Sequence, residues 1–328
     1  MTGYLVLENV GKIYTLKPSK IGGGVRHVHA VEGVNLEVAR GETLGLVGES
    51  GCGKSTLAKL IMHLEVPTGG RVVIDGVDHS RLRGPALKQA RRNFQMIFQD
   101  PQASLNPRMK ARAIIGEILG NYGAASSQRV DELAVLVGLS DFHLDRYPHQ
   151  LSGGQCQRIG IARAIALNPG LIIADEPVSA LDVSIQAQIL NLIGRLRQQL
   201  DLTMVFISHD LSVVSHVADR VAVMYLGRIV EIGGTESLFR NPQHPYTRML
   251  LEAVPQPTPA KRHARAAVSG ELPSPIDPPS GCHFRTRCAF AGDECASKVP
   301  ELRPIDGLHR VACHKAETIA SSLNMNVA

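Results

Sequence analysis

The stretch Thr43-Leu44-Gly45-Leu46-Val47 runs directly into Gly48-Glu49-Ser50-Gly51-Cys52-Gly53-Lys54-Ser55-Thr56. The first five residues are short, β-rich and uncharged, as expected of a strand buried on both faces. The next eight match the pattern G-x-x-x-x-G-K-[ST], and residues 54–64 read as a helix. A strand, a glycine-rich turn and a helix in this order predict a phosphate-binding loop.

Each residue type in this loop has a physical reason to be there. Glycine at 48, 51 and 53 lets backbone N–H groups converge on phosphate oxygens that side chains would block. The helix N-terminus adds partial positive charge. Lys54 would supply a full charge to the β- and γ-phosphates, and the Ser55 hydroxyl can bind Mg²⁺. The loop therefore predicts a nucleoside triphosphate with Mg²⁺.

Two carboxylates follow a second apolar run. Leu171–Ala174 reads as a buried strand, and Asp175 and Glu176 come at its end. Asp175 would hold Mg²⁺ through its water shell, while Glu176 would polarise the attacking water as general base. Alternatively, Asp175 and Glu176 are two surface acids without a catalytic role. The phosphate loop upstream argues against this alternative.

The composition is that of a globular protein. From Tyr4 to about Phe239, strand-like and helix-like segments alternate, which predicts an α/β fold with a largely parallel sheet. Hydrophobic residues make up 44% and the net charge is +5, so nucleic-acid binding is not demanded. No window is apolar enough to span a bilayer, and we read no export signal, so we expect a cytoplasmic location.

A second glycine turn opens a second predicted helix, over residues 155–167. Leu151-Ser152-Gly153-Gly154-Gln155 is identical to the signature of the ATP-binding-cassette ATPases, which this chain resembles. A helix end of this kind attracts anions, although it can also be a plain cap. The resemblance implies that two subunits dimerise head to tail, with residues Ser152, Gly153, Gly154 and Gln155 of one completing the ATP site of the other.

Other matches to the family stand in the expected order. The resemblance implies that Gln99 senses Mg²⁺ and the attacking water, that Asp182 lies at the dimer seam, and that His209 contacts the γ-phosphate and the water. Adenine usually needs an aromatic face. No other Phe, Tyr or Trp lies between Tyr14 and the phosphate loop, so Tyr14 is the candidate, with ordinary packing as the alternative. Cys156 stands where relatives often carry a basic residue.

The branch of the family follows from further segments. Residues 48–56, Ser104–Pro107, His244–Thr247 and Pro273–Cys282 look like the ATPase subunits of oligopeptide and dipeptide importers. That resemblance implies ATP hydrolysis on the cytoplasmic face of the bacterial inner membrane, by a peripheral subunit paired with a second ATPase in a heterodimer or a homodimer. Its other partners would be two transmembrane permease subunits and, indirectly, an extracytoplasmic peptide-binding protein.

Three other functions compete with peptide import. The same engine could serve an importer of nickel or glutathione, because the ATPase never touches the cargo. Non-transport ATPases of this fold carry coiled-coil insertions, internal zinc modules or two cassettes, none of which we find in the sequence. A simple P-loop kinase or GTPase would leave the signature and His209 unexplained.

The resemblance also implies the organisation of the chain. We expect a P-loop NTPase of the ATP-binding-cassette type over residues 1–254, with a RecA-like parallel-sheet core, N-terminal antiparallel strands and a helical signature subdomain at about 100–168. Prolines and the basic cluster Lys261-Arg262-His263 mark a linker over 255–281. A small cysteine-rich extension of the oligopeptide-transporter type fills 282–328.

That extension holds Cys282, Cys288, Cys295 and Cys313, separated by gaps of five, six and seventeen residues. In a reducing compartment, clustered thiols favour a metal site over disulfides. The gaps are wider than in common zinc folds. Similar tails are thought to hold a 4Fe-4S iron–sulfur cluster, which four thiolates can ligate. Zinc, with His283, His309 and His314 as alternative ligands, and a metal-free set of buried thiols remain open.

Overall fold

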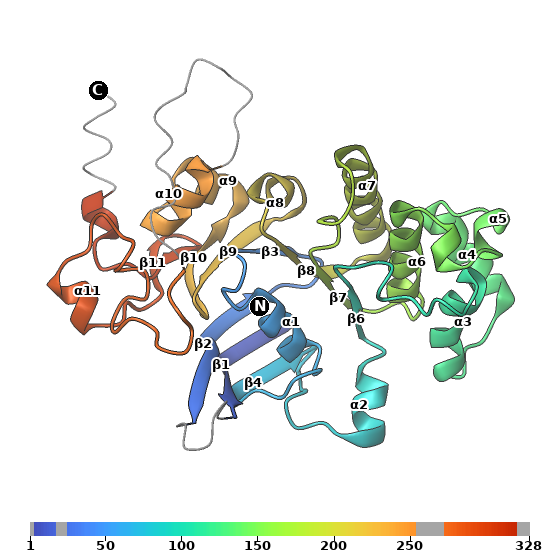
Figure 1. The fold of residues 1–328 in the computed structure, drawn as a ribbon, viewed down its shortest axis with the longest axis horizontal. Helices are drawn as coiled ribbons and strands as arrows, with labels where there is room; N and C mark the ends of the chain where they lie inside the picture. Colours follow the sequence, from blue (N-terminus) through green and yellow to red (C-terminus); the bar gives the residue numbers. More distant parts are fainter. Residues whose placement is uncertain (1–2, 18–24, 254–271, 320–328) are drawn as a thin grey trace, which may run out of the picture.

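The computed structural model describes residues 3–17, 25–253 and 272–319, in which an eight-stranded sheet lies beside a four-stranded one (Figure 1). In spatial order the larger sheet contains β11 (Arg303–Asp306), β12 (His309–Val311), β10 (Arg228–Gly234), β9 (Arg220–Tyr225), β3 (Thr43–Val47), β8 (Thr203–Ser208), β7 (Leu171–Asp175) and β6 (Phe94–Ile97). The smaller sheet contains β2 (Arg26–Val38), β1 (Leu5–Leu16), β4 (Gly69–Ile74) and β5 (Val77–Asp78).

The five strands from β9 to β6, which is one edge of the large sheet, are parallel, and β10, β12 and β11 add to β9 in antiparallel pairs. Every residue of β3, β7 and β8 is buried, which explains why these strands are uncharged except for the terminal Asp175. The predicted strands at 43–47 and 203–208 are confirmed, and the strand predicted at 171–174 extends one residue further. The prediction of an α/β ATPase core with N-terminal antiparallel strands is also confirmed.

The helices lie around the large sheet and in a separate lobe (Figure 1). They are α1 (Lys54–Ile61), α2 (Gly84–Ala90), α3 (Ala111–Asn121), α4 (Ser127–Val137), α5 (Asp141–Leu144), a 3₁₀ turn (Pro148–Gln150), α6 (Gly153–Ile165), α7 (Val183–Leu200), α8 (Leu211–Val217), α9 (Thr235–Arg240), α10 (Pro245–Glu252) and α11 (Asp293–Ser297). Helices α3, α4, α5 and α6 pack together as the lobe beyond β6, within the predicted helical subdomain.

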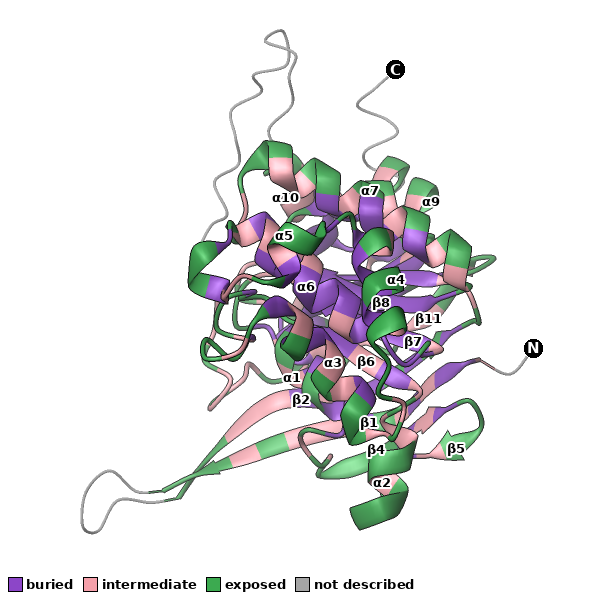
Figure 2. Ribbon diagram, turned by 90° about the vertical axis from the view of Figure 1, so that its right-hand side faces the viewer, coloured by how far each residue is buried: buried purple, intermediate pink, exposed green. Residues whose placement is uncertain are grey.

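Two apolar clusters form the core. One joins the helical lobe, α7, α8 and one face of the large sheet, and the other fills the space between α1, the small sheet and the opposite face. Figure 2 shows this buried interior, and shows the β1–β2 hairpin reaching beyond it as an exposed arm. The two clusters pack against the two faces of the large sheet. The loops at the strand ends lie outside these clusters and can bind a ligand.

The C-terminal extension continues the large sheet. Strand β12 pairs with β10 in antiparallel register, Glu231 opposite Val311, and β11 pairs with β12. Of the predicted linker 255–281, the structure describes only 272–281; the basic cluster at 261–263 lies outside the described residues. The division into body, linker and tail stays a prediction.

Candidate nucleotide-binding site

The candidate site lies where four parallel strands end. Strands β3, β6, β7 and β8 are neighbours running in one direction, so their carboxyl ends meet at one edge of the sheet. The loops that leave this edge carry the glycine-rich turn, Gln99, the pair Asp175-Glu176 and His209. In open α/β sheets, ligands bind in the crevice outside these strand ends. Residues spread over 160 positions of sequence are thereby brought to one place.

The phosphate loop wraps back on its own lysine. Lys54 is buried, and its Nζ donates hydrogen bonds to the carbonyl oxygens of Gly48 at 2.6 Å and Glu49 at 2.9 Å. Helix α1 begins at Lys54, so the ammonium group and the helix N-terminus lie at the same end of the loop. Phosphate oxygens placed there would meet a full charge and the first free N–H groups of the helix.

Two glycines of this loop allow no side chain. Gly48 has a φ of 155°, and an added Cβ would lie 2.2 Å from the carbonyl oxygen of Met224. Gly53 has a φ of 110°, and its Cβ would lie 2.3 Å from the carbonyl oxygen of Ala30. Both obstacles are backbone atoms, which cannot rotate away. The glycines are therefore needed for the close passage of the loop past β9 and β2, as well as for access by phosphate.

The two residues expected to bind Mg²⁺ face each other. The Ser55 hydroxyl donates to Asp175 Oδ1 at 3.2 Å, joining the start of α1 to the end of β7. Burial raises the pKa of Asp175, an effect that the Ser55 hydrogen bond opposes and the neighbouring Glu176 reinforces. A cation between these oxygens would favour the ionised carboxylate. A hydroxyl and a carboxylate at this spacing are hard oxygen ligands of the kind that Mg²⁺ takes.

Glu176, which follows β7, contacts residues that follow two other strands, β6 and β8. Its Oε2 accepts a hydrogen bond from Gln99 Nε2 at 3.0 Å and lies 3.2 Å from His209 Nδ1. Its backbone has a φ of 46°, a conformation unusual for a residue other than glycine, and its N–H donates to the carbonyl of Ile207. Backbone strain of this kind is found at functional sites, where the surroundings hold it. The strain directs the carboxylate toward Gln99 and His209.

Of these residues, Lys54, Ser55, Gln99, Glu176 and His209 line one open cavity of about 540 Å³, whereas Gly48 and Asp175 are not part of its described lining. Its polar end is formed by Ser50, Gly51, Gly53, Lys54, Ser55, Thr56, Gln99, Glu176 and His209, and its apolar end by Tyr14, Val28, Ala30 and Pro275. Tyr14 on β1 lies directly across from Val28 on β2. A triphosphate at the polar end would extend its base toward Tyr14. The volume is within the range of known ligand pockets.

The signature turn lies elsewhere. Ser152 is exposed at the start of α6, where its hydroxyl accepts from Gln155 N at 3.3 Å and its N–H donates to Gln155 Oε1 at 2.9 Å. This reciprocal pair caps a helix of 13 residues. Neither Ser152, Gly153, Gly154 nor Gln155 is among the described residues that line the cavity. The capped helix end is therefore presented to solvent, available to a second molecule.

Two further predicted residues also lie outside the cavity lining. Asp182 is exposed at the N-cap of α7, and its side chain makes no capping hydrogen bond. Cys156 is fully buried inside the helical lobe, and its Sγ donates to the Pro148 carbonyl at 3.5 Å. Burial raises the pKa of the Cys156 thiol. The cysteine that departs from the family pattern is thus a packing residue.

Sequence reasoning missed two residues that hold the phosphate loop from behind. Glu49, a variable position of the loop, forms a two-pronged ion pair with Arg287 of the extension at 2.7 and 2.8 Å. The Glu49 N–H donates to the hydroxyl of Tyr246 on α10 at 2.8 Å. Both partners lie about two hundred positions away in sequence, and no local pattern signals such pairs; only the resemblance at 244–247 had marked Tyr246.

The four cysteines of the extension lie around one small pocket, together with Phe284, Phe290 and Ile319. They are free thiols. Burial raises the pKa of Cys313 to about 11, and the other three thiols add to this effect. Within residues 3–17, 25–253 and 272–319, no three His, Cys, Asp or Glu side chains form a group that could hold a metal ion.

The chain matches known families over most of its length. Residues 31–179 match the ABC transporter family and residues 230–295 the C-terminal region of oligopeptide/dipeptide transporters. It is 52% identical to a probable peptide ABC transporter ATP-binding protein of Sinorhizobium fredii, over 94% of this chain and 89% of that protein. It is 49% identical to the oligopeptide transport ATP-binding protein AppF of Bacillus subtilis, over 94% of this chain and 96% of AppF.

Solved structures agree with these matches. The dimeric post-hydrolysis state of the ATP-binding cassette MJ0796, bound to ADP and phosphate, superimposes with a TM-score of 0.62 and 32% identity, over 70% of this chain and 98% of the other. CbiO1 of Clostridium perfringens superimposes with a TM-score of 0.62 and 26% identity, over 73% of this chain and 92% of the other. The chain belongs to the ATP-binding proteins of ABC transporters, in the branch with the oligopeptide/dipeptide C-terminal region.

Proposed function

We propose that this chain binds and hydrolyses ATP to energise the import of di- and oligopeptides through a membrane ABC transporter. The observation that carries the proposal is one cavity lined by Lys54, Ser55, Gln99, Glu176 and His209, with Asp175 hydrogen-bonded to Ser55. That set supplies phosphate binding, a Mg²⁺ site and a general base, the three requirements of hydrolysis. The names of the relatives support peptide as cargo.

The roles follow from the geometry. Lys54 would exchange its hydrogen bonds with the loop carbonyls for bonds to the β- and γ-phosphates. Ser55 and Asp175 would hold Mg²⁺, with Gln99 next to it. Glu176 would take a proton from the attacking water, and His209, 3.2 Å from its carboxylate, would orient that water and contact the γ-phosphate.

The proposal includes a second subunit. The exposed N-terminus of α6 at Ser152 carries partial positive charge and has no phosphate of its own to bind. In a head-to-tail pair it would cover the γ-phosphate in the cavity of the partner, with Asp182 at the seam. The dimeric state of MJ0796 supports this arrangement. The partner would be a second ATPase or a second copy, carried by two permease subunits that receive cargo from a peptide-binding protein.

The location follows from this assembly. No helix among the described residues is long and apolar enough to cross a bilayer. We propose that the subunit binds peripherally to the permeases at the cytoplasmic face of the cell membrane.

The direct test is Glu176→Gln. The amide keeps an oxygen to accept from Gln99 but cannot take a proton, so we expect hydrolysis to fall by at least about 100-fold while MgATP affinity stays within about threefold. The assay is phosphate release by the transporter purified from native membranes, beside MgATP titration. The control is Glu132→Gln on α4, whose carboxylate contacts Gln128 and Arg129 far from the cavity. Hydrolysis within threefold of wild type would refute the assignment of the base.

Cargo needs its own measurement. We expect phosphate release by the reconstituted transporter and its binding protein to rise when di- or oligopeptides are added. A rise with nickel or glutathione and none with peptide would replace the cargo and leave the ATPase assignment intact.

We further propose a 4Fe-4S cluster at Cys282, Cys288, Cys295 and Cys313. Support comes from four free thiols around one pocket, none of them in a disulfide. The gaps of five, six and seventeen residues between the cysteines are wider than in common zinc folds, which favours a cluster over zinc. The raised pKa values of the thiols mean that a bound cation would displace protons. The test is iron, sulfide and zinc content after anaerobic purification, with Cys282→Ser as control; iron- and sulfide-free protein would end this proposal.

A further inference from the structure

The apolar end of the nucleotide cavity contains one residue from the described part of the predicted linker, just before the C-terminal extension. Pro275 lines the cavity with Tyr14, Val28 and Ala30, although it is 245 positions from Ala30 in sequence. Its carbonyl accepts a hydrogen bond from His29 N at 2.9 Å. Strand β2 is an edge strand of the small sheet, so this bond places Pro275 along the outer side of β2, where Glu32 N also donates to the Gly227 carbonyl.

Leu272, three residues before Pro275, lies beside the phosphate loop. A Cβ added to Gly51 would lie 3.8 Å from Leu272 Cδ2, an ordinary van der Waals distance. The chain therefore passes close to Gly51 at Leu272 and then reaches β2 at His29.

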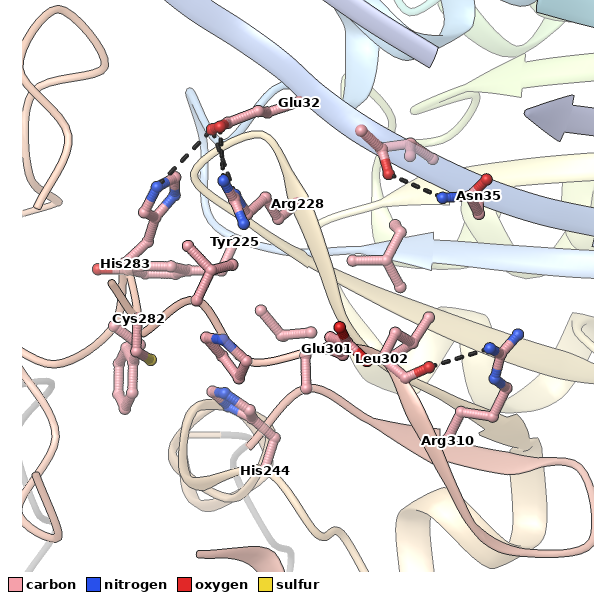
Figure 3. Close-up of a pocket in the computed structure, with 18 of the residues that line it drawn as sticks. Glu32, Asn35, Tyr225, Arg228, His244, Cys282, His283, Glu301, Leu302 and Arg310 are labelled. Atoms are coloured by element: carbon pink, nitrogen blue, oxygen red, sulfur yellow. Dashed lines mark hydrogen bonds and ion pairs between the residues drawn. The ribbon is translucent and has the colours of Figure 1, made fainter. Parts of the chain in front are cut away.

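The extension is fixed to the body at several points beyond Pro275. His283 Nε2 lies 3.7 Å from a carboxylate oxygen of Glu32 on β2, and Glu32 also pairs with Arg228 on β10 (Figure 3). The ring of His283 also lies 3.2 Å from the Leu226 carbonyl, in the turn between β9 and β10. These contacts hold the extension against the two elements that carry Ala30 and the backbone behind Gly48.

Arg287 ends this stretch with the strongest contact. Its side chain is 3% exposed, and it grips both oxygens of Glu49 in the phosphate loop. The pairing with Glu49 raises the pKa of Arg287, so the charge is permanent. A buried two-pronged ion pair fixes direction as well as distance. Glu49 is consequently held by the extension, and with it the carbonyl that Lys54 contacts.

We infer that the segment 272–287, which runs from the linker into the C-terminal extension, is part of the nucleotide site: Pro275 forms a wall against the base, and Arg287 is a positioning residue that shapes the phosphate loop through Glu49. The ligand is the nucleoside diphosphate or triphosphate of the proposed function, on which the inference rests. Pro275 would pack its ring against the base held by Tyr14. Arg287 would touch no part of the nucleotide.

The two roles are separated by comparing MgADP with magnesium pyrophosphate, which has the phosphates but no base. Neither ligand is hydrolysed, so binding to the full-length chain is measured at equilibrium, with pyrophosphate followed by competition. We expect Pro275→Gly to weaken MgADP about three- to tenfold, from the loss of roughly one ring face of apolar contact, and to leave pyrophosphate within about twofold. Arg287→Lys, which keeps the charge but loses the fork, should weaken both ligands by about three- to tenfold.

The controls are matched to each change. Pro278→Gly alters a proline of the same run that is not in the described lining of the cavity, and Arg285→Lys alters an arginine of the same turn whose side chain bonds to Ser280 among the described residues. Both should leave both ligands within about twofold. If Pro275→Gly does not fold, Pro275→Ala takes its place.

The other possible results each refute one part of the inference or the proposed function. Equal weakening of both ligands by Pro275→Gly, or no weakening of MgADP, would overturn the base contact. Unchanged pyrophosphate binding in Arg287→Lys would overturn the positioning role. Failure of the wild-type chain to bind MgADP would instead refute the proposed function.

Discussion

Glu231 on β10 is one of the residues that join the C-terminal extension to the ATPase body, and replacing it by glutamine tests its contribution to that junction. Its side chain is fully buried. One oxygen accepts from Gln243 N at 2.7 Å and lies 2.7 Å from His309 Nε2 on β12. The other accepts from His244 N, 2.9 Å away, just before α10. The carboxylate thus serves two backbone donors and one histidine of the extension.

The cost of Glu231→Gln can be worked from these contacts. An amide has one accepting oxygen, so if it faces Gln243 and His309, its NH₂ group faces the His244 N–H. The His244 N–H then has no acceptor, and a buried donor left without one costs about 1–3 kcal/mol, so the free energy of unfolding should fall by about 1–3 kcal/mol. The opposite orientation lets the NH₂ group donate to His309 Nε2 in its other tautomer but leaves the Gln243 N–H without an acceptor, at a similar cost.

The assay is urea unfolding of the full-length chain at neutral pH, with hydrogen exchange to locate the loss. Exchange should quicken at the amides of Gln243, His244 and β12. The control is Glu236→Gln on α9, because Glu236 pairs only with Arg240 and both side chains are more than 70% exposed. That change should alter stability by less than about 0.5 kcal/mol. A Glu231→Gln chain as stable as the control would refute the reasoning.

Two further predictions concern a buried histidine and the phosphate loop. Burial lowers the pKa of His244 from 6.5 to about 4, so the unfolded chain binds the proton first; stability should fall by about 1.4 kcal/mol per unit as pH drops from 6.5 toward 4, and His244→Asn should remove that part of the slope in acid urea titrations. A slope unchanged in His244→Asn would contradict this. Gly53→Ala places a Cβ 2.3 Å from the Ala30 carbonyl and should weaken MgATP at least about tenfold. Gly120→Ala on α3, where no atom lies within 4 Å, is its control; equal MgATP affinity in the two variants would count against the steric argument.

The sequence predicted those features of the fold that depend on neighbouring residues in the chain. Glycine is required at 48 and 53 because an added Cβ would lie within 2.3 Å of a backbone oxygen, and the run 43–47 is uncharged because it is buried on both faces, so both features left a pattern in the sequence. Strand order then brought Gln99, Glu176 and His209 together. Helix ends were less predictable: α1 stops at Ile61, before the expected Leu64, and α6 runs from Gly153, directly after its capping serine, to Ile165, two residues earlier at each end than expected.

The sequence predicted that a C-terminal extension is present, but not how it contacts the ATPase body. Its prolines and cysteines indicated a linker and a separate tail, but Arg287 pairs with Glu49 across 238 positions, and β12 adds to a sheet formed by the body. Pairs of this kind depend on tertiary packing and leave no periodic pattern in the chain. The nucleotide wall at Pro275 was missed for the same reason.

ATP cleavage between two copies of the cassette, with Ser152 of one covering nucleotide on the other, is the claim on which the account stands. Phosphate release per chain during serial dilution tests it most directly, for wild type and Ser152→Glu, with the co-purifying ATPase subunit at a fixed ratio. We expect the rate of phosphate release per chain to fall as dilution separates the pairs. The Ser152→Glu variant should be inactive at every concentration and should still bind MgADP with the affinity of wild type. A rate that neither dilution nor Ser152→Glu changes would contradict it.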